Sequence, residues 1–165
     1  MKKRLTICLL AAMAICSCSA DKQHGSTAAA PQETITSEEP AKAQENKGTI
    51  FHDITLPEAL ERAKAESKLV FIECHTKTCG PCRMMKKNIF PQEKVGNYIN
   101  NNFISIMRDV EEGEGIEITQ KYNVGIYPTY LIIDTLSNCV GQVVGADKDA
   151  DSFIQKIKDA AAGKQ

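Results

Sequence analysis

The sequence predicts one α/β domain, in which a central mixed β-sheet is flanked by helices on both faces. Three observations lead to this expectation. From residue 49 onward, short apolar runs of strand length alternate with segments whose apolar residues recur at helical spacing. A strand, a crossover helix and a second strand in succession imply parallel pairing. Turn residues between the last two apolar runs imply a hairpin, and therefore an antiparallel half of the same sheet.

The first two elements are expected at 56–66 and 69–73. The helix begins at a capping box, because Thr55 and Glu58 are three positions apart and Pro57 stands in the first turn. The run 69–73 is short and apolar, which favours a strand. The remaining elements are expected in the order helix 80–90, helix 93–100, strand 103–110, helix 116–122, strand 129–133, strand 139–144 and helix 150–162.

The boundaries of these later elements follow from breakers and turns. Pro91 interrupts the helix that contains Met84 and Met85, and we interpret this methionine pair as core rather than metal ligands. The acidic, glycine-containing run 111–115 lacks the ligand spacing of a calcium loop, so it predicts a solvated connection. The run 134–138 is rich in turn residues and predicts the hairpin turn.

Residues 1–17 are expected to be a bacterial lipoprotein signal peptide, because a basic start precedes an apolar stretch too short to span a bilayer. Ile15 and Ser17 stand three and one positions before Cys18, which resembles a lipobox, and the sulfur of Cys18 would then receive the lipid. The alternative is an ordinary secretory peptide cut after Ser17 or Ala20. Either reading predicts a protein of the periplasm or cell envelope. The lipid would also hold the protein on a membrane without a spanning helix.

Residues 18–48 are mostly small and polar, and such a composition cannot bury enough apolar surface to offset chain entropy. We therefore expect a lipidated cysteine followed by a disordered tether, and a folded domain over 49–165. The whole chain has 20 basic and 21 acidic residues and a net charge of −1. This balance gives no electrostatic reason to expect a nucleic-acid partner.

The most informative motif is the CGPC motif, residues 79–82, which comes shortly after the strand 69–73 and opens the next helix. Two thiols three positions apart on one helix face can close a reversible disulfide. The helix N-terminus stabilises a thiolate at Cys79, which predicts that Cys79 is the nucleophile. Cys82 would then attack the sulfur of Cys79 and release a reduced client, which makes it the resolving thiol.

With these residues, the chain resembles the thioredoxin superfamily over about residues 50–163. The CGPC motif matches the active-site tetrapeptide of that family. Tyr127 and Pro128, placed before a strand, resemble its cis-proline loop, and Glu73 falls where thioredoxins hold a buried acid. The resemblance implies a thioredoxin-like fold.

The resemblance also implies roles for residues outside the motif. Glu73 would be buried and would accept the proton of Cys82 when that thiol attacks. Pro128 would be cis and, with Tyr127, would offer backbone groups and an apolar contact to an extended client. Thr78 stands where the family usually has tryptophan, and it would lie beside the client.

The expected function is that of an extracytoplasmic thiol–disulfide oxidoreductase, most simply a protein-disulfide reductase. It would need no cofactor and no metal. Its partners would be exported proteins with disulfides or thiols and a membrane electron donor or acceptor. The alternatives are an oxidant or isomerase, a permanent disulfide clip, a redox-inert interaction module, and a metal-binding module that uses Cys79, Cys82 and His75.

Three further residues have open roles. We interpret His75 as a surface histidine, with tuning of the thiolate or contact with a partner as alternatives. Cys74 and Cys139 are interpreted as small core residues, and a bridge between them stays open.

Overall fold

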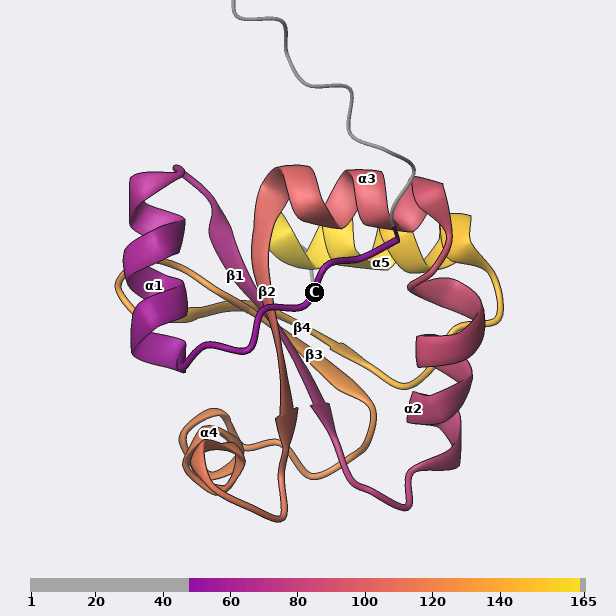
Figure 1. The fold of residues 1–165 in the computed structure, drawn as a ribbon, viewed down its shortest axis with the longest axis horizontal. Helices are drawn as coiled ribbons and strands as arrows, with labels where there is room; N and C mark the ends of the chain where they lie inside the picture. Colours follow the sequence, from indigo (N-terminus) through magenta and orange to yellow (C-terminus); the bar gives the residue numbers. More distant parts are fainter. Residues whose placement is uncertain (1–47, 164–165) are drawn as a thin grey trace, which may run out of the picture. The chain divides into compact units, whose positions relative to one another are not determined.

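The structure is a computed structural model that describes residues 48–163. The predicted signal peptide, the predicted lipid site Cys18 and the tether up to residue 47 lie outside the described residues. Figure 1 shows the described elements in chain order. These elements are α1 Leu56–Ala65, β1 Leu69–His75, α2 Gly80–Met84, the π-helical turn η1 Met85–Ile89, α3 Glu93–Asn102, β2 Phe103–Asp109, α4 Glu114–Tyr122, β3 Thr129–Ile133, β4 Cys139–Val144 and α5 Ala150–Ala161.

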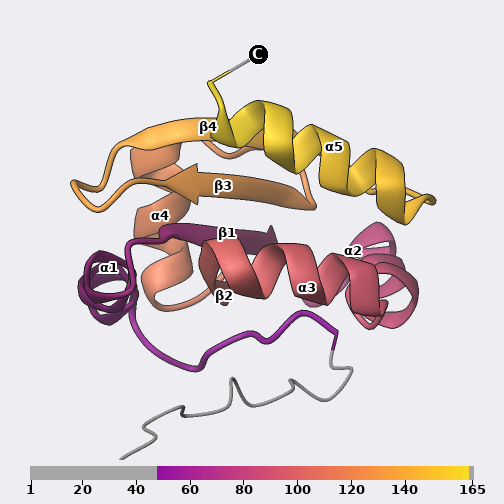
Figure 2. The same cartoon turned by 90° about the horizontal axis from the view of Figure 1, so that it is seen from above.

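The four strands form one mixed sheet in the order β2-β1-β3-β4. β1 pairs in parallel with β2 and antiparallel with β3, and β3 pairs antiparallel with β4. The strands follow one another in this order when the sheet is viewed from above (Figure 2). The expected fold class, with its parallel and antiparallel halves, is therefore confirmed.

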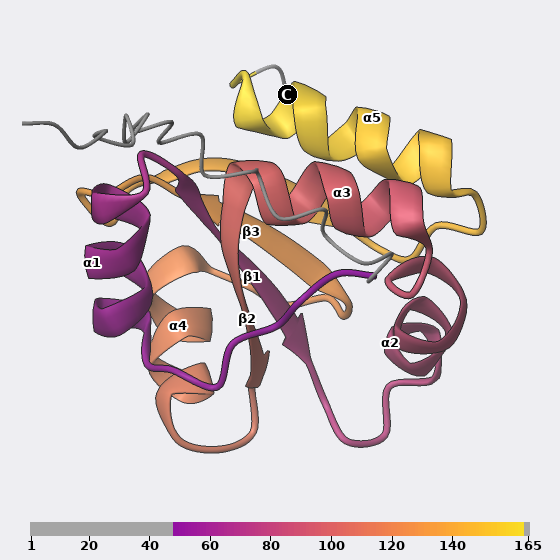
Figure 3. The ribbon, with the colours of Figure 1, turned by 45° about the horizontal axis from the view of Figure 1, so that its top comes forward.

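The two faces of the sheet have separate cores because successive side chains of a strand point to opposite faces. On one face, Phe71 of β1 packs with buried residues of η1, α3 and α5. On the other face, Val70 and Ile72 pack with buried residues of α1 and α4. In Figure 3, α3 and α5 lie side by side over the first face, and α1 and α4 belong to the second. Helices thus cover both faces, as expected.

Local signals placed the first helix correctly. The Thr55 hydroxyl accepts a hydrogen bond from the backbone N–H of Glu58, and the Glu58 carboxylate accepts one from the backbone N–H of Thr55. Helix α4, by contrast, begins two residues before the expected 116. The Glu114 carboxylate lies in its first turn and accepts hydrogen bonds from the backbone N–H of Leu56 and from Arg108. The end of the acidic run is therefore tied to α1 and β2, and the expectation of a wholly solvated loop is wrong there.

The expected helix 80–90 is α-helical only as far as Met84, and a π-turn completes it. In an α-helix, five residues cover about 140° beyond a full turn, which would turn Phe90 away from the face of Met85. In the structure the Phe90 N–H donates to the Met85 carbonyl at 3.0 Å, and Met85, Ile89 and Phe90 are all buried. The wider turn lets these three side chains share one core.

Within the described residues, no helix is both long and apolar enough to cross a membrane.

Candidate active site

The CGPC motif lies where β1 ends and α2 begins. Cys79 is the residue before the helix, and its Sγ accepts a hydrogen bond from the backbone N–H of Cys82 at 3.1 Å. The two cysteines form a disulfide, with Cα atoms 5.3 Å apart. Cys79 is partly exposed, whereas Cys82 is 1% exposed. A client disulfide can therefore approach the sulfur of Cys79 but not that of Cys82.

The start of this helix also favours attack by Cys79 once the disulfide is reduced. The N–H that faces its sulfur belongs to the first turn, where backbone donors have no partner within the helix. Such donors, together with the helix dipole, stabilise a thiolate relative to a thiol. The site can therefore hold a reactive thiolate at the surface and a protected thiol beneath it. Thr78, expected beside the client, is exposed next to Cys79.

The second loop of the site precedes β3. The Tyr127–Pro128 peptide bond is cis, as the resemblance implied. Thr129 pairs with Cys74, so β3 begins at the end of the sheet where β1 ends (Figure 1). Pro128, directly before β3, therefore lies at the same end of the sheet as the loop that leads from β1 to Cys79. The backbone N–H of Gly145 donates to the Pro128 carbonyl at 2.8 Å, which fixes the loop against the end of β4.

The most exposed apolar side chain of this loop is not that of Tyr127, which the sequence had suggested as the apolar contact for a client. Tyr127 is only partly exposed, while the preceding residue, Ile126, has 62% of its surface exposed. The hydroxyl of Thr129 donates to the Ile126 carbonyl at 2.7 Å and holds the turn. The sequence analysis did not identify Ile126, although its position directly before Tyr127 was the available signal.

Glu73 is fully buried on the face of β1 that α2 and η1 cover. Its Oε2 lies 2.7 Å from His75 Nδ1 and 3.8 Å from Lys86 Nζ. The atoms of the closer pair are not aligned for a hydrogen bond, and neither Glu73 oxygen has a hydrogen-bond partner in the described part of the chain. The residue opposite Glu73 on β2 is Met107, which carries no charge. The two basic groups near Glu73 belong instead to β1, which contains His75, and to η1, which contains Lys86.

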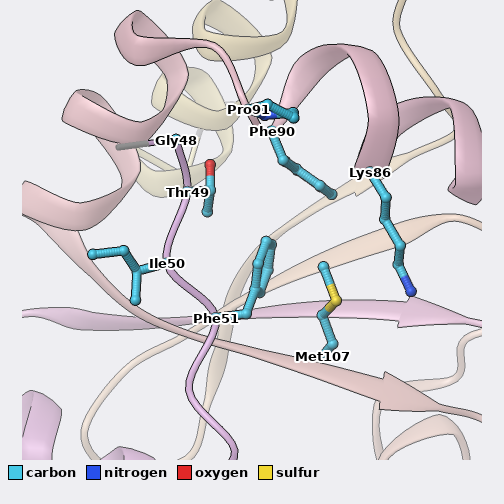
Figure 4. Close-up of a pocket in the computed structure, with 8 residues that line it drawn as sticks. All are labelled: Gly48, Thr49, Ile50, Phe51, Lys86, Phe90, Pro91 and Met107. Atoms are coloured by element: carbon cyan, nitrogen blue, oxygen red, sulfur yellow. The ribbon is translucent and has the colours of Figure 1, made fainter. Parts of the chain in front are cut away.

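His75 and Lys86 correct the sequence interpretation. His75 was expected to be a surface residue, but 17% of its side chain is exposed. It lies two residues after Glu73 in an extended strand, so both side chains point to the same face. Lys86 extends from η1 toward the strands and lines a pocket of about 430 Å³ beside Phe51 and Met107 (Figure 4). No local pattern indicated Lys86, because its contact with Glu73 joins η1 to β1.

A buried tyrosine faces the same region. Tyr130 on β3 pairs directly with Glu73, and burial, followed by the nearby Glu73 charge, raises the pKa of its hydroxyl. That hydroxyl is buried and has no hydrogen-bond partner among the residues that the structure describes.

The other two described cysteines are free, and their environments differ. Cys74 is fully buried, as expected, and burial raises the pKa of its thiol to about 12. Cys139 is exposed at the start of the edge strand β4, so its interpretation as a core residue is wrong. Cys74 aligns with Thr129 and Cys139 with Ile133, four residues apart on β3, or about 13 Å along the strand. This separation rules out a bridge between them.

Metal binding was the alternative use of Cys79, Cys82 and His75. Over residues 48–163, no group of three or more histidine, cysteine, aspartate or glutamate side chains has an arrangement that could hold a metal ion. His75 Nδ1 instead lies 2.7 Å from Glu73 Oε2.

Comparison with known proteins agrees with this geometry. A family model described as thioredoxin-like matches residues 50–135. A solved protein of Bacteroides thetaiotaomicron, proposed to be a disulphide-isomerase, is 40% identical; the alignment covers 70% of this chain and 95% of that one, with a TM-score of 0.63. Thioredoxin H-type of Oryza sativa subsp. indica is 34% identical over 90 residues, which are 54% of this chain and 68% of that protein. Spermatogenesis-associated protein 20 of Rattus norvegicus is 38% identical over 60 residues, but the chain spans only 8% of its length.

Proposed function

The chain belongs to the thioredoxin-like family, and we propose that it is a thiol–disulfide oxidoreductase that reduces disulfides of exported proteins. One observation supports this most strongly. A partly exposed Cys79 at a helix start is bonded to a buried Cys82, so one sulfur is available to a client and the other is protected. A permanent structural clip of so few residues would contribute little to stability in the loop-entropy description.

The proposed reaction transfers two electrons to the client. The Cys79 thiolate attacks one sulfur of a client disulfide, a mixed disulfide forms, and the other client sulfur leaves as a thiolate. Cys82 then passes its proton to the Glu73 carboxylate and attacks the Cys79 sulfur. The Cys79–Cys82 disulfide forms and the second client thiolate is released. Water protonates the client thiolates, and a membrane electron donor would return the protein to the dithiol.

The client would lie along the cis-proline loop. Ile126 offers an exposed apolar side chain, and the backbone next to Pro128 is at the end of an antiparallel strand pair. An extended client segment can add main-chain hydrogen bonds at such a position. Thr78 and Tyr127 would complete the contact on either side of the sulfur.

We place the protein in the periplasm or cell envelope, anchored by lipid at Cys18. The support is the sequence alone: a signal peptide over 1–17 that ends in a lipobox-like stretch. Labelling of cells with a palmitate analogue should mark the wild type and not Cys18→Ser. Label that persists in Cys18→Ser would refute the anchor site.

Insulin reduction by the purified protein, with Cys79→Ser as control, tests the activity, and equilibration with glutathione tests its direction. A potential near about −270 mV supports a reductase, and a potential above about −150 mV would indicate an oxidant. An isomerase is the second candidate, because the similar Bacteroides thetaiotaomicron protein is proposed to be one. An isomerase should restore activity to ribonuclease with scrambled disulfides. Recovery with a variant that keeps Cys79 but lacks Cys82 would favour the isomerase over the reductase.

A trapping experiment tests client turnover. Cys82→Ser should accumulate mixed disulfides between Cys79 and exported proteins on non-reducing gels of cell envelopes. The double variant with Cys79→Ser is the matched control and should accumulate none. Absence of adducts in the single variant would contradict turnover of protein clients.

A further inference from the structure

One charged side chain beside the CGPC motif takes no part in the reaction proposed above. Arg83 directly follows Cys82 on α2 and is exposed. Its Nη2 atom lies 3.8 Å from the point where a side chain at Gly80 would begin. Gly80 is exposed and directly follows Cys79. Because Gly80 has no side chain, nothing at that position separates the guanidinium from a molecule that approaches Cys79.

The Arg83 side chain is held in place without being neutralised. Its Nη1 donates a hydrogen bond to the Lys77 carbonyl at 3.3 Å, which joins α2 to the loop before Cys79. Arg62 and Arg108 each form a salt bridge with a glutamate at 2.7 Å, whereas Arg83 forms none within residues 48–163. A guanidinium has five N–H donors in a planar fork, so one bond to a carbonyl leaves an edge for another acceptor. Since the side chain is already ordered, less conformational entropy is lost when an acceptor binds.

The segment that holds the two cysteines is basic. Residues 76–89 contain four basic side chains and no acidic one. Two of these are paired, because Lys77 Nζ lies 2.6 Å from Glu112 and Lys86 Nζ lies 3.8 Å from Glu73. Arg83 and Lys87 have no salt bridge in the described part of the chain, and of these two it is Arg83 whose guanidinium lies beside Gly80.

We propose that Arg83 determines client specificity: it binds a carboxylate next to the attacked cysteine, so that the protein prefers disulfides flanked by aspartate or glutamate. This inference rests on the proposed function. A carboxylate offers two oxygens that match the guanidinium fork. The Cys79 thiolate repels an acidic client, and the cation beside Gly80 offsets this repulsion at the point where the two sulfurs meet.

Reduction of short model peptides tests the inference. Each substrate is a disulfide-linked dimer of one peptide, so either sulfur presents the same neighbours. The two residues that flank the cysteine are both glutamate, both glutamine or both lysine. Chromatography follows the loss of each dimer in an excess of the reduced full-length protein. Each rate is divided by the rate with 2-mercaptoethanol, which removes the intrinsic effect of the flanking charges on the disulfide.

The wild type should reduce the glutamate dimer about two- to fivefold faster than the glutamine dimer, and the lysine dimer should react most slowly. High salt should shrink this preference, because salt screens exposed charges. Arg83→Gln should bring the ratio of the glutamate to the glutamine rate to about one. Within one variant this ratio is unaffected by any change in the reactivity of Cys79, since both rates depend on the same thiolate.

Two further variants separate position from charge. Arg83→Lys should give an intermediate ratio, because lysine keeps the charge and loses the fork. Lys87→Gln is the matched control: Lys87 is also exposed and basic, but it lies one turn further from the cysteines, and the wild-type ratio should persist.

The outcomes distinguish this inference from the proposed function. If Arg83→Gln keeps the ratio of Lys87→Gln, or if the wild type has no preference for the glutamate dimer, the inference is wrong. Reduction of the glutamine dimer would still support the proposed function in either case. If the wild type reduces none of the dimers, the proposed function itself fails.

Discussion

Removal of one buried oxygen should stabilise this protein. The hydroxyl of Tyr130 is buried and has no hydrogen-bond partner among residues 48–163. Its ring contributes through aromatic contacts that do not involve the hydroxyl. It stacks on Phe71 with centroids 5.6 Å apart, and it meets Phe90 and Phe153 edge-on at 6.0 and 5.0 Å. Tyr130→Phe keeps the ring and removes only the hydroxyl.

The size of the effect follows from two opposing contributions. A buried hydroxyl without a partner costs about 1–3 kcal/mol of folding free energy. The void left by one oxygen, about 15 Å³, costs roughly 0.4 kcal/mol at about 24 cal/mol per Å³. The free energy of unfolding should therefore rise by about 1 kcal/mol or more, which corresponds to a Tm increase of about 4 °C for a domain of this size.

Tyr122→Phe is the matched control for urea and thermal unfolding. The hydroxyl of Tyr122 is within hydrogen-bond distance of the Ser137 carbonyl at 3.2 Å and of its Oγ at 3.0 Å. Its removal should lower the free energy of unfolding by about 1 kcal/mol. If Tyr130→Phe is destabilised to the same degree as Tyr122→Phe, the Tyr130 hydroxyl has a partner in solution and the reasoning is refuted.

Three other predictions concern single sites. Gly145→Ala should lower the free energy of unfolding by about 1–2 kcal/mol, because Gly145 has a φ of +90°, and an unchanged urea midpoint would contradict this. Iodoacetamide should modify the exposed Cys139 in the native protein and spare Cys74, because burial raises the pKa of the Cys74 thiol to about 12. Equal labelling of the two cysteines in peptide mass spectra would contradict this prediction and show that the core opens. The side-chain hydrogen bond from Arg62, followed by the one from Lys68, lowers the pKa of Glu66 from 4.5 to about 2. Its stabilising contribution should be complete above pH 4.5 and lost as the pH falls toward 2; acid unfolding curves that are identical in Glu66→Gln and wild type would exclude it.

The elements of the fold were predictable because their signals are local. The capping box at Thr55 fixed the start of α1, and short apolar runs fixed the strands within one or two residues. The position of the CGPC motif between a strand and a helix also followed from the sequence, as did its likeness to a known family. Each of these features depends on neighbours along the chain.

The features that could not be predicted depend on contacts between distant elements. The burial of His75 and its approach to Glu73 require that β1 continue two residues further, opposite Arg108 and Asp109. The contact of Lys86 joins η1 to Glu73 on β1, two elements that are separated along the chain. Composition and periodicity contain no signal for either arrangement.

The unequal burial of the two bonded sulfurs has a kinetic consequence. Since Cys82 is 1% exposed, an incoming molecule can meet only its covalent neighbour Cys79, and in the proposed reaction the attack by Cys82 would be intramolecular. By this route, the time that a captured client stays attached would be independent of the client concentration. The residence time would then be an intrinsic constant of the domain, and an excess of client would saturate capture without hastening release.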